Sequence, residues 1–113
     1  MDVDIFPLLR RVLENTKKRV CNWEKAGQDT YRLLLRSGSI TIKKGVESFL
    51  SNPLEPDILY KVRLFDQNEC FYTLDVINKK SEDYVIANDL FQAIRDEENR
   101  RINEKISLLL NEI

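Results

Sequence analysis

The sequence predicts an α+β fold: an N-terminal helix, an antiparallel meander of four to five strands, and a long C-terminal helix, with both helices packed on one sheet face. Apolar residues recur at helical spacing over residues 5–20 and again from about residue 88 to the end. Between these segments, apolar and polar residues alternate, as they do in half-buried strands. With 113 residues and no internal repeat or linker, we expect a single domain over residues 1–113.

The N-terminal helix is expected over residues 5–20. Asp4 can cap it, and Pro7 falls in the first turn, where its missing N–H costs nothing. The basic run 17–19 lies where the helix C-terminus carries partial negative charge. The apolar stripe of this helix contains Ile5, Leu9, Val12, Leu13, Thr16 and Val20.

Turn residues divide the central part of the chain into strands. A turn at residues 37–39 joins the second and third strands, and Gly45 is expected to stop the third. The connection through Pro53 and Pro56 follows, in which residues 46–50 could form a helical turn. Residues 66–69 close the clearest hairpin. The expected strands are 20–24, 30–36, 40–45, 58–65 and 70–77.

The inward side of these strands is apolar, and so is one stripe of the C-terminal helix. A one-residue slip of the hairpin would bury Lys61, Arg63 and Asp75, so its register is well specified. The helix has a polar gap at residues 95–101, but i,i+4 charge pairs and the absence of Gly or Pro favour one continuous helix. Residues 84–87 could be a short strand or the start of this helix. Inward positions are Tyr31, Leu33, Leu35, Tyr60, Val62, Leu64, Tyr72, Leu74 and Val76, and the helix stripe is Leu90, Ile94, Ile102, Ile106, Leu109 and Ile113.

The composition excludes several kinds of chemistry. The chain has no histidine, which removes Ser-His and Cys-His nucleophiles and imidazole acid–base catalysis. None of its three glycines belongs to a phosphate-binding loop. Cys21 and Cys70 are 49 positions apart, and we expect two small buried side chains rather than a metal or redox site. We therefore expect a protein that is not an enzyme, with no catalytic, cofactor or metal site.

The outward face of the sheet is the first candidate surface. Basic residues interleaved with aromatic ones can bind single-stranded nucleic acid, and the same mixture is common at protein interfaces. An ordinary half-solvated sheet face is the alternative. The net charge of −1 argues against a dedicated duplex-DNA binder. Candidate partner-binding residues are Arg32, Leu34, Arg36, Lys43, Lys61, Arg63, Phe65 and Phe71, with Ile77 nearby.

The end of the C-terminal helix is the second candidate surface. Three consecutive leucines, 108–110, spread over more than half of the helix circumference, so one core cannot bury them all. A helix of about 26 residues is about 39 Å long and a strand of eight residues about 27 Å, so the helix should overhang its sheet. Alternatively, helix 5–20 and the loop through Pro53 cover the leucines. The expected dimer-interface residues are Ile106, Leu108, Leu109, Leu110 and Ile113.

These features favour a small non-enzymatic interaction or regulatory protein, a homodimer that acts on a protein partner through its sheet face or its C-terminal helix. A nucleic-acid-contacting accessory protein that uses the basic sheet face is the alternative. A small-molecule pocket between helices and sheet, lined by Trp23, Tyr31, Tyr60 and Tyr72, is a third hypothesis. With no apolar run of the roughly 20 residues that a bilayer requires, and no basic leader, we expect a cytoplasmic protein without membrane contact.

Overall fold

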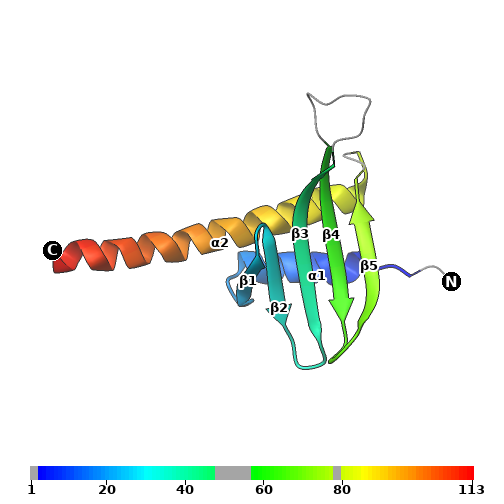
Figure 1. Cartoon of the computed structure of the whole chain (residues 1–113), viewed down its shortest axis with the longest axis horizontal. Helices are drawn as coiled ribbons and strands as arrows, with labels where there is room; N and C mark the ends of the chain where they lie inside the picture. The colour runs from blue at the N-terminus through cyan, green and yellow to red at the C-terminus, as the bar shows by residue number, and fades with distance from the viewer. Residues whose placement is uncertain (1–2, 48–56, 78–79) are drawn as a thin grey trace.

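The computed structural model describes residues 3–47, 57–77 and 80–113, and it confirms the α+β fold. Five antiparallel strands form one sheet in the order β1-β2-β3-β4-β5, with one helix before and one after it (Figure 1). The elements are α1 (Phe6–Lys17), β1 (Trp23–Gly27), β2 (Thr30–Leu34), β3 (Ser39–Glu47), β4 (Asp57–Phe65), β5 (Cys70–Val76) and α2 (Glu82–Glu112).

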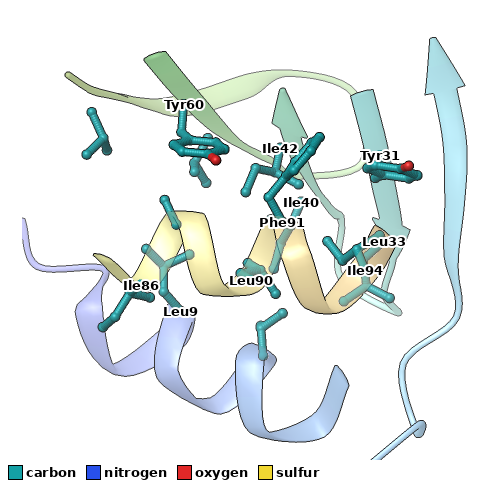
Figure 2. Close-up of a cluster of buried hydrophobic side chains, with 14 of the residues drawn as sticks. Leu9, Tyr31, Leu33, Ile40, Ile42, Tyr60, Ile86, Leu90, Phe91 and Ile94 are labelled. Atoms are coloured by element: carbon teal, nitrogen blue, oxygen red, sulfur yellow. The ribbon is translucent and has the colours of Figure 1, made fainter. Parts of the chain in front are cut away.

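Both helices lie on the same side of the sheet, as expected. α2 contacts β4 and β5, crosses the strands toward the β1 edge and continues beyond it, while α1 packs along α2 (Figure 1). The Phe91 ring points from α2 toward the sheet, with the rings of Tyr31 and Tyr60 at 5.5 and 5.6 Å (Figure 2). Tyr60 also donates a hydrogen bond to Asn88 Oδ1 at 2.7 Å. These contacts determine how α2 is oriented on the sheet.

α1 begins and ends inside its expected range. Asp4 Oδ1 accepts a hydrogen bond from the Phe6 N–H at 2.9 Å, although the cap position itself is Ile5. The buried Thr16 hydroxyl accepts from Trp23 Nε1 at 2.9 Å and so ties the end of the helix to β1. The expected extension to residue 20 was wrong, because the helix ends at Lys17 and Arg19 adopts a left-handed φ of 62°. Val20 is exposed as a result.

The first three strands have boundaries that differ from expectation. The first strand covers Trp23–Gly27 rather than residues 20–24. β2 ends at Leu34, so Leu35 and Arg36 belong to the following turn and Leu35 is exposed rather than inward. β3 does not stop at Gly45 but continues to Glu47 in register with β4, which excludes a helical turn at residues 46 and 47. The rest of the connection through Pro53 lies outside the described residues.

The β4–β5 hairpin forms as expected. Val62 pairs with Leu74 and Leu64 with Tyr72, and these inward side chains join the core. The turn is closed by Asp66, whose Oδ1 accepts hydrogen bonds from the N–H groups of Asn68 and Glu69 at 3.1 and 2.9 Å. These bonds hold the pKa of Asp66 below its usual value.

α2 is one continuous helix of 31 residues, as predicted through residues 95–101. It starts earlier than residue 88, because Ser81 Oγ accepts a hydrogen bond from the Tyr84 N–H and residues 84–87 are helical. Glu97 bonds Arg100 at 2.6 Å and Arg101 at 3.4 Å, and the hydrogen bond from Arg100 is the main reason that the pKa of Glu97 is lowered. Arg100 pairs with Glu97 and Glu104. No helix in the described ranges combines the length and apolar character needed to span a membrane.

Gly38 in the β2–β3 turn occupies a position where a side chain has no room. A Cβ there would lie 1.9 Å from the Phe65 carbonyl oxygen, because the two turns at this end of the sheet touch through their backbones. We expect Gly38→Ala to lower the free energy of unfolding by at least about 2 kcal/mol. Urea unfolding followed by circular dichroism measures this change.

Gly27→Ala is the matched control. Its added Cβ would meet only the Thr30 side chain, with Cβ at 3.7 Å and Oγ1 at 3.8 Å, and these are ordinary contacts, so we expect a change within about 0.5 kcal/mol. Equal effects of the two substitutions would contradict the close backbone approach at Gly38.

Candidate interaction surfaces

The C-terminal part of α2 leaves the domain past the β1 edge. Its last side-chain bond to the domain runs from Arg101 Nη2 to Asn22 Oδ1 at 3.3 Å. Beside it, a hollow of about 160 Å³ lies between α2 and β1 and includes Trp23, Ile102 and Lys105 in its lining. Figure 1 shows the remainder of the helix extending clear of the sheet. We call residues 102–113 the free segment.

The free segment carries an apolar stripe with no cover in this structure. Ile102 and Ile106 are each 47% exposed, Leu109 is 61% exposed, and Ile113 is fully exposed. Their spacing of four, three and four residues places them on one helix face. Leu110 flanks this face, whereas Leu108 lies on the other side of the helix. No described part of α1 or of the strand-end turns covers these residues, and the loop through Pro53 lies outside the description.

The stripe of the free segment continues the face with which α2 packs on the sheet. Ala87, Phe91 and Ile94 are buried on this face. Glu98 follows at the same helical spacing and accepts a hydrogen bond from the Tyr31 hydroxyl at 3.2 Å. Ile102 comes next, where the sheet ends. One face of the helix is therefore covered by the sheet up to residue 98 and uncovered after it.

The open face of the sheet carries two polar rows that cross the strands. The first row runs Thr30–Lys43–Lys61–Asp75 and the second Glu24–Arg32–Thr41–Arg63–Thr73, as the strand register dictates. Arg32 pairs with Glu24 at 2.6 Å, and Lys61 pairs across the strands with Asp75 at 3.7 Å. Within the described residues, Lys43 and Arg63 have no acidic partner.

A hollow of about 360 Å³ lies among these rows. Lys43, Lys61, Arg63 and Phe65 of the expected surface line it together, while Leu34 and Phe71 are exposed near the strand ends. Arg36 is not part of this strand face, because β2 ends before it. The residues that complete the lining are Thr30, Thr41, Gly45 and Leu59.

The four aromatic residues expected around a small-molecule pocket do not line a shared cavity. Tyr31 and Tyr60 are buried in the core, and only Trp23 and Tyr31 reach the hollow between α2 and β1. Burial raises the pKa of Tyr60 to about 12, and burial together with the nearby Glu98 carboxylate raises the pKa of Tyr31. Both hydroxyls are therefore protonated at neutral pH and act as hydrogen-bond donors to α2.

The expectation of two buried cysteines was wrong. Cys70 is exposed at the start of β5, because it lies beside the hairpin turn, and Cys21 is only partly buried before β1. Both are free thiols. In the part of the chain that the structure covers, no three His, Cys, Asp or Glu side chains gather as a metal site would require.

Sequence reasoning missed several members of both surfaces. The hydroxyl groups of Thr30 and Thr41 could have been found from the strand register, since they share rows with the basic residues. Ile102 was assigned to the helix stripe but not to the interface, because the point where the sheet ends cannot be read from spacing. Lys105 and Glu112, which border the stripe, carried no distinguishing signal of their own.

Comparisons with protein-family models, with curated proteins and with solved structures found no match to this chain. Its function is therefore inferred from the chemistry of the two surfaces alone.

Proposed function

We propose that this protein is a small, non-enzymatic interaction protein that forms a homodimer through the free segment of α2. The observation that carries the proposal is the uncovered stripe of Ile102, Ile106, Leu109 and Ile113. The free segment projects beyond the sheet, and its exposed apolar side chains have the spacing that is typical of a helix–helix interface. The lack of histidine and of a metal cluster among the described residues supports a binding role over catalysis.

The second helix must run antiparallel to the first. Upstream of residue 102, the same helix face is occupied by the sheet, through Phe91 and Ile94. A parallel second copy would place its own sheet alongside these residues, where the two sheets would occupy the same space. An antiparallel second copy overlaps only over residues 102–113 and keeps the two domains at opposite ends of the interface.

Antiparallel pairing also matches the charges that border the stripe. A two-fold arrangement places Ile106 against Leu109 of the second copy, and Ile102 against Ile113 of the second copy. Lys105 and Glu112 each precede a stripe residue, so Lys105 then faces Glu112 of the second copy, and this pair occurs twice. In parallel pairing, Lys105 would instead face Leu110. Charge complementarity thus favours the same direction as the steric argument.

The interface is short, so the dimer should be weak. Twelve residues per copy cover fewer than two heptads, and association itself costs about 4–15 kcal/mol, so we expect a Kd on the order of 1–100 μM. The end of the second helix also arrives at the 160 Å³ hollow beside Trp23, which offers Ile113 of the second copy additional apolar contact.

Leu109→Asn should disrupt the dimer without affecting the domain. Two leucines per dimer would lose burial worth about 1.5–3 kcal/mol each, so we expect Kd to rise at least about 100-fold. Sedimentation equilibrium measures this change. Leu108→Asn, at an equally exposed leucine on the opposite side of the helix, should change Kd by less than about threefold. A monomeric wild-type protein at ~1 mM would refute the proposal.

Charge exchange tests the direction of pairing. Lys105→Glu or Glu112→Lys alone creates two like-charge contacts per dimer, and we expect each to raise Kd about tenfold at low salt. The double variant exchanges the partners of both ion pairs and should restore the wild-type Kd. A double variant as weak as either single variant would contradict the antiparallel register.

Disulfide trapping tests the register itself, with Cys21 and Cys70 replaced by serine. Ile102→Cys and Ile113→Cys variants should cross-link when mixed, because these positions face each other across the interface. Neither should cross-link alone, since eleven residues of helix separate identical positions by about 16 Å. Non-reducing gels measure the products, and self-linking of the Ile102→Cys variant would indicate parallel pairing instead.

A further inference from the structure

The open face of the sheet, which the proposed dimer does not use, holds an unusual arrangement of positive charge. Lys43 and Lys61 are direct register partners on β3 and β4, and Arg63 lies two residues from Lys61 on the same face. Directly opposed side chains are about 5 Å apart at Cβ, and like charges at that separation destabilise a sheet. The sheet nevertheless keeps these two like charges opposite each other on its two strands β3 and β4.

Acidic neighbours neutralise only part of this charge. Asp75 pairs with Lys61 at 3.7 Å, and Glu24 pairs with Arg32 at 2.6 Å. Lys43 and Arg63 are left without an acidic partner among the described residues. Their positive charge is therefore available to an anion from outside the chain.

The geometry around these cations provides space and further donors. The 360 Å³ hollow lies between Lys43, Lys61 and Arg63, and the Thr30 and Thr41 hydroxyls also line it. Gly45 keeps part of the hollow free of side chain, since the nearest atom to an added Cβ is the Leu59 carbonyl oxygen at 4.0 Å. A phosphate group fits these surroundings, because it accepts several charge-assisted hydrogen bonds at once.

Two aromatic residues lie on the same part of the open face: Phe65 is half-buried, and the exposed Phe71 is two residues from Thr73, the register partner of Arg63. Phe65 lines the hollow, and its register partner is Cys70 rather than Phe71, because the β4–β5 pairing shifts at this point. The shift leaves Phe71 unpaired in register and 63% exposed. A bulge of this kind redirects a side chain, and here it presents a flat apolar ring to solvent.

We infer that the open sheet face binds single-stranded nucleic acid, with a backbone phosphate held between Lys43 and Arg63 in the hollow and a base stacked on Phe71. A ligand that alternates phosphate with planar rings matches a face that carries unpaired cations and the exposed ring of Phe71. An acidic peptide provides the charge, but its Asp and Glu side chains carry no ring that could stack on an aromatic side chain. Duplex DNA does not fit, since its major groove admits a helix or a two-stranded ribbon rather than a five-stranded sheet.

Fluorescence anisotropy with labelled dT12 and U12 at 20–300 mM salt tests this inference. Removing both cations that hold the phosphate, in Lys43→Gln/Arg63→Gln, should weaken binding at least tenfold and reduce the salt slope by about 0.7, the value for one phosphate of a single strand. Lys17→Gln/Lys18→Gln removes the same charge at the end of α1, on the helix side, and should change affinity by less than threefold. The Lys43 and Arg63 variant should retain the wild-type Tm or exceed it, because a like-charge contact is removed.

Phe71 separates stacking from charge. Phe71→Leu should weaken binding at least fivefold, whereas Phe71→Tyr, which keeps the ring, should retain the wild-type affinity. The Leu109→Asn variant should bind a short oligonucleotide with unchanged affinity per domain. The nucleic-acid test therefore remains valid even if the protein does not form the proposed dimer. Absence of binding at 20 mM salt, equal binding of poly-glutamate or of duplex DNA, or equal losses in the two charge-removal variants would overturn the inference.

Discussion

The placement of α2 across the sheet is the constraint on which the rest of the structure depends. Phe91 lies between Tyr31 and Tyr60, and the two tyrosine hydroxyls bond Glu98 and Asn88 of the same helix. These contacts fix the rotation of α2 about its own axis. Five strands at about 4.8 Å spacing are roughly 20 Å across, whereas 31 helical residues extend about 46 Å, so the helix must project beyond the sheet. The rotation of α2 that these core contacts determine therefore also decides which way the apolar stripe of the free segment faces.

The fold could be predicted from the sequence because its determinants are local. Helical spacing, strand alternation and turn residues each depend on neighbours within a few positions, and they identified both helices, all five strands and the β4–β5 register. Boundaries were less predictable where long-range contacts decide them. Gly45 continues β3 because β4 pairs with it, and the helix before residue 20 ends early because Arg19 turns the chain toward β1.

The candidate surfaces were predictable in part for the same reason. Strand parity places Arg32, Lys43, Lys61 and Arg63 on one face whatever the sheet packs against. The overhang of α2 was expected from a comparison of helix length with strand length, which assumes that the helix lies along the strands. The helix instead crosses the strands, so the free segment is longer than this comparison implies (Figure 1). The angle between helix and strands depends on packing among Phe91, Tyr31 and Tyr60, and no periodicity encodes it.

The register that buries the core also creates the charge on the open face. Ile42 and Val62 are register partners and are fully buried, and their neighbours Lys43 and Lys61 must then face each other on the other side. The two surfaces nevertheless share no residue, because the free segment extends the helix-facing side and the basic rows lie on the opposite one. Substitutions at either surface should consequently act independently on dimerisation and on the binding of a short oligonucleotide, as expected for distant sites without shared partners. A dimer joined through α2 would carry two uncovered sheet faces. A single-stranded nucleic acid long enough to reach both faces would therefore bind more tightly than one that reaches a single face.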